Sequence, residues 1–269
     1  MGLARIMSAL DFAAMLRAEK RKARSGAVAK PAPQQKSQQS RPAPDAATAA
    51  LDTSRQRPAL QTLPGAPPTI AYAADWISEA EEAAIVAAAK RGDDWVTVRG
   101  RRLRRLGGPA GEAGFAPEPL PRWARDACAA AAASDPSSRP VPNHVLVNSY
   151  DFSKESYVLP HTDGPAYDDR TFTLSCGADA VVVFKERLKT SDIGVRAAAT
   201  RCEVLLRRRS LLAFSREAYT ECTHEIGASP DTLGPRCANL GAANACVGDV
   251  VGRAGERVSF TLRCAGGAE

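Results

Sequence analysis

The sequence predicts a mainly β domain of the sandwich or jelly-roll type, flanked on its N-terminal side by helix. Short runs of β-forming residues follow one another after residue 143, at 144–150, 171–175, 180–184, 203–206, 210–214 and 257–263. Clusters of Gly, Pro, Asp and Ser separate these runs, and their connections vary in length. Many short strands with irregular connections are typical of sandwiches and jelly rolls.

The elements before these runs are expected to begin near Pro67. Residues 70–72 (IAY) predict a short strand. Ser78 and Glu81 have the spacing of a capping box, which predicts a helix that continues to about residue 90. We expect Gly92 to end this helix.

Two further segments follow different patterns. Residues 95–98 (WVTV) predict a strand that leads into an arginine-rich hairpin at Arg99–Arg105. Residues 226–255 are rich in Gly, Ala and Cys with little β pattern, so we expect a long loop insertion. Neither segment forms part of an internal repeat.

Charge divides the chain of 269 residues into two parts. Residues 1–66 hold 11 Lys and Arg against 4 Asp and Glu, whereas residues 67–269 hold 25 against 26. The net charge of +6 therefore comes from the first part, and not from the domain. Residues 26–66 have no aromatic residue and are rich in Ala, Pro, Gln and Ser, a composition that favours disorder. We expect a disordered basic tail at 1–66 and one domain at 67–269.

The N-terminal region also bears on location. Residues 8–24 could form a short helix with basic residues at 20–22, and three interpretations compete: a nuclear-import cluster, a transit peptide or a solvated helix. No signal peptide or long apolar segment is apparent, so we expect a protein of the cytoplasm and nucleus with no membrane partner. The seven cysteines have no regular spacing, and we expect free thiols.

The chemistry-bearing residues begin with the histidines. His161 and Asp163 lie two residues apart at the end of an extended run, so their side chains leave a strand on the same face. His224 lies in another short extended run. Two histidines and one carboxylate form the facial triad that holds ferrous iron, whereas a structural zinc site would recruit cysteines. The alternative is an ordinary turn that contains His-x-Asp.

The last predicted strand, residues 257–263, alternates strictly. Arg257 and Arg263 share one face with Ser259 and Thr261, and apolar residues occupy the other. This face is either the solvated side of an edge strand or the lining of a barrel, where two buried guanidinium groups would require anions such as a dicarboxylate. Asn148 and Tyr150 share a face in the same way and could bind the same ligand.

Together these motifs resemble the AlkB-type iron- and 2-oxoglutarate-dependent dioxygenases, and most of all the sixth AlkB homologue subfamily. The similarity lies in residues 143–150 (NHVLVNSY), 159–167 (LPHTDGPAY), 209–214 (RSLLAF) and 257–263 (RVSFTLR), within a region of about 67–264. It implies a double-stranded β-helix.

The resemblance also assigns roles to site residues. It implies that His161, Asp163 and His224 bind Fe(II). It implies that Arg257, helped by Tyr150, binds the distal carboxylate of 2-oxoglutarate. Asn148 and Arg263 would lie near the other end of this co-substrate, and Arg263 could also bridge to Asp163. Dioxygen would be the second co-substrate.

The implied activity is oxidative demethylation or hydroxylation of an alkylated nucleic-acid base. Two alternatives stay open: the same chemistry on protein side chains, or a nucleic-acid or protein-binding module with a vestigial iron site. The arginines at Arg99–Arg105 would either bind phosphates of DNA or RNA or form only the charged, solvent-exposed surface of a hairpin. We expect a monomer.

Overall fold

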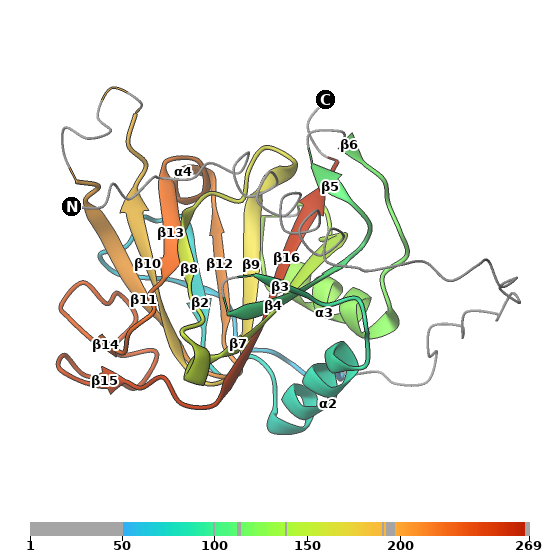
Figure 1. The fold of residues 1–269 in the computed structure, drawn as a ribbon, viewed down its shortest axis with the longest axis horizontal. Helices are drawn as coiled ribbons and strands as arrows, with labels where there is room; N and C mark the ends of the chain where they lie inside the picture. The colour runs from blue at the N-terminus through green and yellow to red at the C-terminus, as the bar shows by residue number, and fades with distance from the viewer. Residues whose placement is uncertain are drawn as a thin grey trace, which may run out of the picture.

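Two antiparallel sheets face each other in the computed structural model, which describes residues 51–98, 100–111, 114–137, 139–189, 191 and 197–266 (Figure 1). The larger sheet has eight strands in the order β1-β2-β12-β9-β16-β7-β4-β3, and the smaller has four in the order β11-β10-β13-β8. Neighbouring strands come from distant parts of the sequence, as in a jelly roll. The predicted mainly β, double-stranded β-helix fold is confirmed.

The predicted strands are all present, some of them longer than expected. The larger sheet contains β1 (Gln61–Thr62), β2 (Ile70–Ala73), β3 (Val96–Val98), β4 (Arg101–Leu106), β7 (His144–Asp151), β9 (Tyr167–Gly177), β12 (Leu211–Ser215) and β16 (Glu256–Ala265). The smaller sheet contains β8 (Val158–His161), β10 (Ala180–Glu186), β11 (Thr200–Leu206) and β13 (Cys222–Ile226). Outside the sheets lie β5 (Ala110–Gly111), β6 (Gly114–Phe115), β14 (Asp231–Thr232), β15 (Val250–Val251), the helices α2 (Glu79–Lys90), α3 (Arg122–Ala133) and α4 (Arg216–Thr220), and a 3-10 turn at Phe152–Lys154.

Strand β16 decides between the two interpretations of its alternating pattern. It lies between β9 and β7 in the middle of the larger sheet, so the edge-strand alternative is wrong. Its apolar residues Val258, Phe260 and Leu262 pack beneath α2 and α3 in a buried cluster. Trp123 of α3 meets Phe260 edge-on, with ring centroids 5.7 Å apart. The polar face therefore points inward, between the sheets.

A second apolar layer fills the space between the two sheets. Leu212 and Phe214 of the larger sheet belong to the same buried cluster as Phe184 and Leu206 of the smaller sheet. This layer sits beside the polar inward face of β16 and leaves a cavity at one end of the barrel.

Residues 226–255 cover the outer face of the smaller sheet. Leu233 and Val251 of this segment cluster with Val181 and Leu205 of the sheet. The Asn239 side chain accepts from the Leu205 amide and donates to the Leu205 carbonyl, each at 2.8 Å, as a neighbouring strand would. The long insertion is therefore packed against the domain, and the short strands β14 and β15 pair with each other near its two ends (Figure 1).

Ser78 and Glu81 form the predicted capping box at the start of α2, with the Glu81 amide donating to Ser78 Oγ at 3.2 Å. The helix ends at Lys90, close to the expected position. Gly92 lies two residues beyond the helix, where a larger residue would displace the end of the Arg104 side chain. Its φ is not positive, but a Cβ there would lie 2.0 Å from the guanidinium carbon of Arg104.

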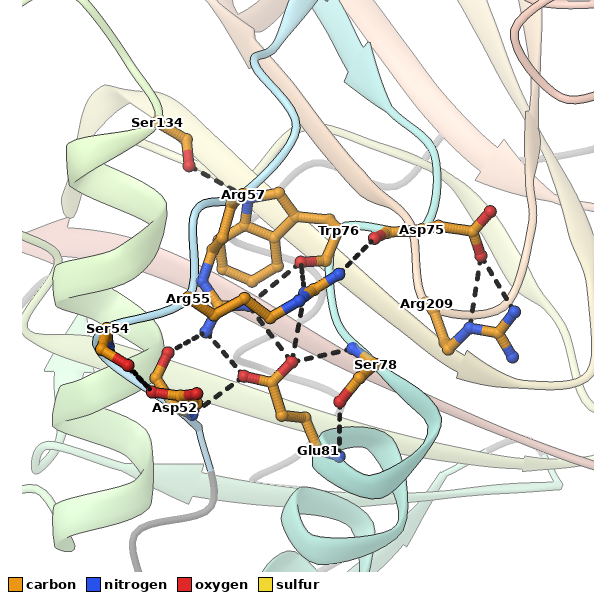
Figure 2. Close-up of polar contacts among 10 residues, drawn as sticks. All are labelled: Asp52, Ser54, Arg55, Arg57, Asp75, Trp76, Ser78, Glu81, Ser134 and Arg209. Atoms are coloured by element: carbon orange, nitrogen blue, oxygen red, sulfur yellow. Dashed lines mark hydrogen bonds and ion pairs between the residues drawn. The ribbon is translucent and has the colours of Figure 1, made fainter.

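Folded structure begins earlier than Pro67. The described chain already contacts the domain at residues 51–66, where Leu51 is buried in the core beneath the helices. Arg55 and Arg57 both pair with Glu81, at 3.2 and 2.8 Å (Figure 2). Residues 1–50, with the predicted helix at 8–24, lie outside the described residues.

The Glu81 carboxylate joins this N-terminal segment to α2. It accepts from both arginines and from the amides of Asp52 and Ser78 (Figure 2). Burial opposes its ionisation, but these hydrogen bonds outweigh burial and hold the pKa of Glu81 below its usual value.

We expect Glu81→Ala to lower the free energy of unfolding by about 2–3 kcal/mol, because it leaves Arg57 buried without its partner. Glu79→Ala, in the same helical turn but with a side chain 79% exposed, should lower it by less than about 0.5 kcal/mol. Urea unfolding at pH 7 measures both. Folding depresses the pKa of Glu81. The difference in the free energy of unfolding between the two variants should therefore persist above the pKa of Glu81 in the unfolded state, and disappear as the pH falls through its pKa in the folded state. Equal losses for the two variants would contradict the assignment.

All seven cysteines are free thiols, as predicted, and only Cys246 is exposed. Burial raises the pKa of Cys202 to about 12. No helix in the described part of the chain has both the length and the apolar composition needed to cross a lipid bilayer.

Candidate active site

A cavity of about 890 Å³ opens between the two sheets. Its lining comes from the inward faces of both, and every predicted site residue belongs to it: His161, Asp163, His224, Asn148, Tyr150, Arg257 and Arg263. This volume is near the upper end of the roughly 300–1,000 Å³ typical of small-molecule sites. The cavity can therefore hold a co-substrate and a second small group together.

His161, Asp163 and His224 converge although 61 residues separate the last two in the sequence. The strands β8 and β13 pair so that His161 and His224 are direct cross-strand neighbours, with ring centroids 4.2 Å apart. Asp163 follows β8 and places Oδ1 4.0 Å from His224 Nε2. One ligand atom from each residue lies within 4.8 Å of the others.

Neighbouring groups orient this triad. His161 Nδ1 lies 2.9 Å from the Leu159 carbonyl oxygen, which assigns its proton to Nδ1 and leaves Nε2 to bind a metal. Thr171 donates to Asp163 Oδ2 at 2.8 Å, and Arg263 donates to Oδ1 at 2.9 Å. The bridge from Arg263 to Asp163 is the one that the resemblance implied.

The electrostatics of the triad favour metal binding. Burial lowers the pKa of both His161 and His224, and each keeps a neutral ring. Burial opposes ionisation of Asp163, but the charge of Arg263 and the hydrogen bond from Thr171 favour it, and the pKa of Asp163 is depressed. Neutral imidazoles and an ionised carboxylate are the forms that coordinate a metal. The donor set of two nitrogens and one oxygen fits Fe(II) with open positions for further ligands.

The opposite end of the cavity presents an unsatisfied cation. Arg257 is fully buried, and among the described residues its Nε and Nη1 have no hydrogen-bond partner, while Nη2 donates to Ser175 at 3.0 Å. Its guanidinium carbon lies 5.1 Å from the centre of the Tyr150 ring. Burial lowers the pKa of Arg257, so an anionic partner would relieve a large desolvation penalty. A carboxylate fits this position.

Asn148 and Arg263 complete the polar path between these two ends. Asn148 Oδ1 and Arg263 Nε are buried atoms that no hydrogen bond from the described chain satisfies. On the sheet, Asn148 lies opposite Ser259, two residues from Arg257 and four from Arg263. Arg257 and Asn148 therefore offer neighbouring unsatisfied polar atoms for a dicarboxylate co-substrate, and Arg263 offers one more beside the metal triad.

Several cavity residues had no signal in the sequence that could single them out. Thr171, which lines the cavity, and Ser175, which accepts a hydrogen bond from Arg257, are ordinary strand residues of β9 until the pairing of β9 with β16 places them opposite Arg263 and Ser259. His144 and Tyr167 also line the cavity. For His144, the one usable sign was its spacing of four residues before Asn148 on the same strand face.

The arginine-rich segment divides between two faces of β4. Arg101 is buried and lines the cavity. Arg104, on the other face, donates to the Ala89 carbonyl oxygen at 2.9 Å and pairs with Asp94. Arg102 lies over the Trp95 ring at 4.8 Å, and Arg105 is exposed at the cavity. Arg99 lies outside the described residues. The segment is thus not one phosphate-binding surface, and Arg105 is the member that reaches both solvent and cavity.

The turn at 207–209 has a structural role. Arg207 pairs with Asp179, and Arg208 and Arg209 reach acidic residues at the start of α2.

Comparison with known proteins agrees with this geometry. No protein-family model matches the sequence. The probable RNA/DNA demethylase ALKBH6 of Danio rerio is 31% identical over 204 residues, which cover 74% of this chain and 86% of that protein.

Two solved structures are also similar. OsALKBH1 has a TM-score of 0.46 and 17% identity, covering 76% of this chain and 99% of that one. An oxidoreductase of the 2OG-Fe(II) oxygenase family from Burkholderia pseudomallei has a TM-score of 0.44 and 15% identity, covering 72% and 83%. On its identity to the zebrafish protein, this chain belongs to the AlkB family of iron- and 2-oxoglutarate-dependent dioxygenases, close to ALKBH6.

Proposed function

We propose that this dioxygenase removes alkyl groups from nucleic-acid bases. The observation that carries the proposal is one cavity in which the metal triad and the unsatisfied Arg257 lie at separate places, with room left for a base. The name of the zebrafish relative, probable RNA/DNA demethylase, supports the same substrate class.

The chain's own residues would hold the reactants in order. His161, Asp163 and His224 would hold iron, and Arg257 with Tyr150 would hold the distal carboxylate of 2-oxoglutarate. When bound, iron would supply the oxidation of a C–H bond to C–OH by one oxygen atom of dioxygen, with the other atom converting 2-oxoglutarate to succinate and carbon dioxide. A hydroxylated N-methyl group then leaves as formaldehyde. The apolar layer beside the cavity excludes water from this chemistry.

A base must leave its stack to enter such a cavity. Two exposed arginines stand at the cavity on different sheets, Arg105 on β4 and Arg187 after β10. They are placed to contact phosphates on either side of an extruded nucleotide.

The test is succinate release with Fe(II) and 2-oxoglutarate, measured without a second substrate and with methylated oligonucleotides or methylated peptides. We expect the oligonucleotides to stimulate it. Stimulation by peptides alone would move the substrate to protein side chains, and oligonucleotide binding without any turnover would indicate a binding module.

A double variant, Arg105→Ser with Arg187→Ser, should weaken oligonucleotide binding about tenfold at 100 mM salt and reduce the slope of log K against log salt by about 1–2. Fluorescence anisotropy over a salt series measures both. Arg236→Ser is the matched control, because Arg236 is 65% exposed but lies outside the cavity lining. An unchanged slope in the double variant would show that the two arginines do not contact phosphates and are only exposed to solvent.

A further inference from the structure

His144 is a buried polar group without a function in the scheme above. It is 1% exposed and lines the cavity. Neither ring nitrogen forms a well-aligned hydrogen bond with the described residues; a weaker interaction with the backbone of Gly108 favours the protonated ring but is outweighed by burial. Leaving such a group unsatisfied costs about 1–3 kcal/mol, so a partner in the cavity is the physical expectation.

The position of His144 on β7 separates it from the co-substrate. His144, Leu146, Asn148 and Tyr150 alternate along the inward face and all line the cavity. Tyr150 lies opposite Arg257, and His144 lies opposite Arg263 at the other end of the strand pair. Six residues at about 3.4 Å each place His144 roughly 20 Å along the strand from Tyr150. This span is too long for one small dicarboxylate that is anchored at Arg257.

The surroundings of His144 lead toward the metal triad. Its ring lies 5.2 Å from the Tyr167 ring, at an interplanar angle of 55°. The Arg263 guanidinium carbon lies 4.2 Å from the centre of Tyr167, and Arg263 pairs with Asp163. His144 and Tyr167 therefore form a wall of the cavity that Arg263 links to the metal ligand Asp163.

The imidazole of His144 is neutral at physiological pH. Burial, and after it the positive charges of Arg263 and Arg105, lower the pKa of His144 to about 3. A neutral imidazole has one donor and one acceptor nitrogen. Beside the flat face of Tyr167, this pair matches the edge of a heteroaromatic ring that carries both an acceptor and a donor.

We propose that His144 hydrogen-bonds to the edge of the substrate base while Tyr167 packs against its face, so that the two residues determine which base is accepted. The inference rests on the proposed function, and it adds a residue that contacts the substrate and not the metal or 2-oxoglutarate.

The experiment compares His144→Phe, which keeps a buried ring but removes both nitrogens, with His144→Asn, which keeps a donor and an acceptor. Binding of a methylated oligonucleotide is measured by anisotropy on the iron-loaded protein with 2-oxoglutarate and without oxygen. We expect His144→Phe to weaken binding about 5- to 30-fold and His144→Asn to recover part of the loss. The KM for 2-oxoglutarate and the succinate release without substrate should stay within about twofold. Val141→Ala, with Val141 54% exposed just before β7, is the control for local disturbance of the strand.

Two results would overturn the inference: unchanged oligonucleotide binding by His144→Phe, or a raised KM for 2-oxoglutarate in that variant. If His144→Phe fails to fold, Tyr167→Leu tests the same wall, since Tyr167 is half-buried and its loss should weaken binding to a similar extent. Failure of the proposed function would be seen in the wild-type protein itself. That protein would then bind no methylated oligonucleotide, and no methylated oligonucleotide would stimulate its succinate release.

Discussion

Replacing His161 or Asp163 with alanine is expected to lower succinate release at least about 100-fold and to reduce the iron retained after desalting. Each variant removes one of three donors that converge in the cavity, and the two that remain hold the metal poorly. For Asp163→Ala the loss also frees Arg263 from its 2.9 Å contact. Metal content by atomic emission and coupled succinate assays measure the two effects.

Leu159→Ala is the matched control for these variants. Leu159 is on the same strand as His161 and is 37% exposed, and it holds His161 only through its carbonyl oxygen, which alanine keeps. This variant should retain activity and iron. Turnover within about threefold of wild type in either ligand variant would remove that residue from the metal site.

Replacing Arg257 with methionine should change ligand affinity and stability in opposite directions. Loss of a buried guanidinium that binds a carboxylate costs about 2–5 kcal/mol, so the affinity for 2-oxoglutarate should fall at least about 30-fold. In the free protein, however, Arg257 is buried with unsatisfied Nε and Nη1 atoms, as far as the described chain extends. An apolar side chain of similar length should therefore leave the free energy of unfolding unchanged or raise it.

Calorimetric titration with 2-oxoglutarate, with manganese in place of iron, gives the affinity, and urea unfolding without ligand gives the stability. Ser175→Ala is the control, because it removes only the hydrogen bond from Arg257 Nη2 to the Ser175 hydroxyl. It should change the affinity for 2-oxoglutarate less than about fivefold. A methionine variant that is strongly destabilised but binds 2-oxoglutarate normally would show that Arg257 has a structural role instead.

The sequence predicted the core of this site because its residues repeat at the period of a strand. Arg257 and Arg263 alternate with Val258, Phe260 and Leu262, so the burial of one face fixes the direction of the other. His161 and Asp163 are likewise two residues apart, so their side chains were predicted to leave the strand on the same face. Cross-strand register has no such local pattern, which is why the contacts of Thr171 and Ser175 with this site emerged only from the structure.

Charge clusters were the least informative feature. Arg101 to Arg105 look uniform in the sequence, yet the pairing of β4 with β7 and the packing of α2 send their side chains to different environments. Residues 51–66 were expected to be disordered by composition, but two arginines, Arg55 and Arg57, find the carboxylate of Glu81 on a distant helix. Such long-range ion pairs are invisible to composition.

The central place of β16 has a consequence for biosynthesis. This strand is made last among those of the larger sheet, yet it pairs with both β7 and β9 over most of their length. Until it emerges from the ribosome, two long strands have open edges that can recruit other chains. A chain that ends before Glu256 would therefore expose both edges and be prone to aggregate, in place of folding to a weakened enzyme.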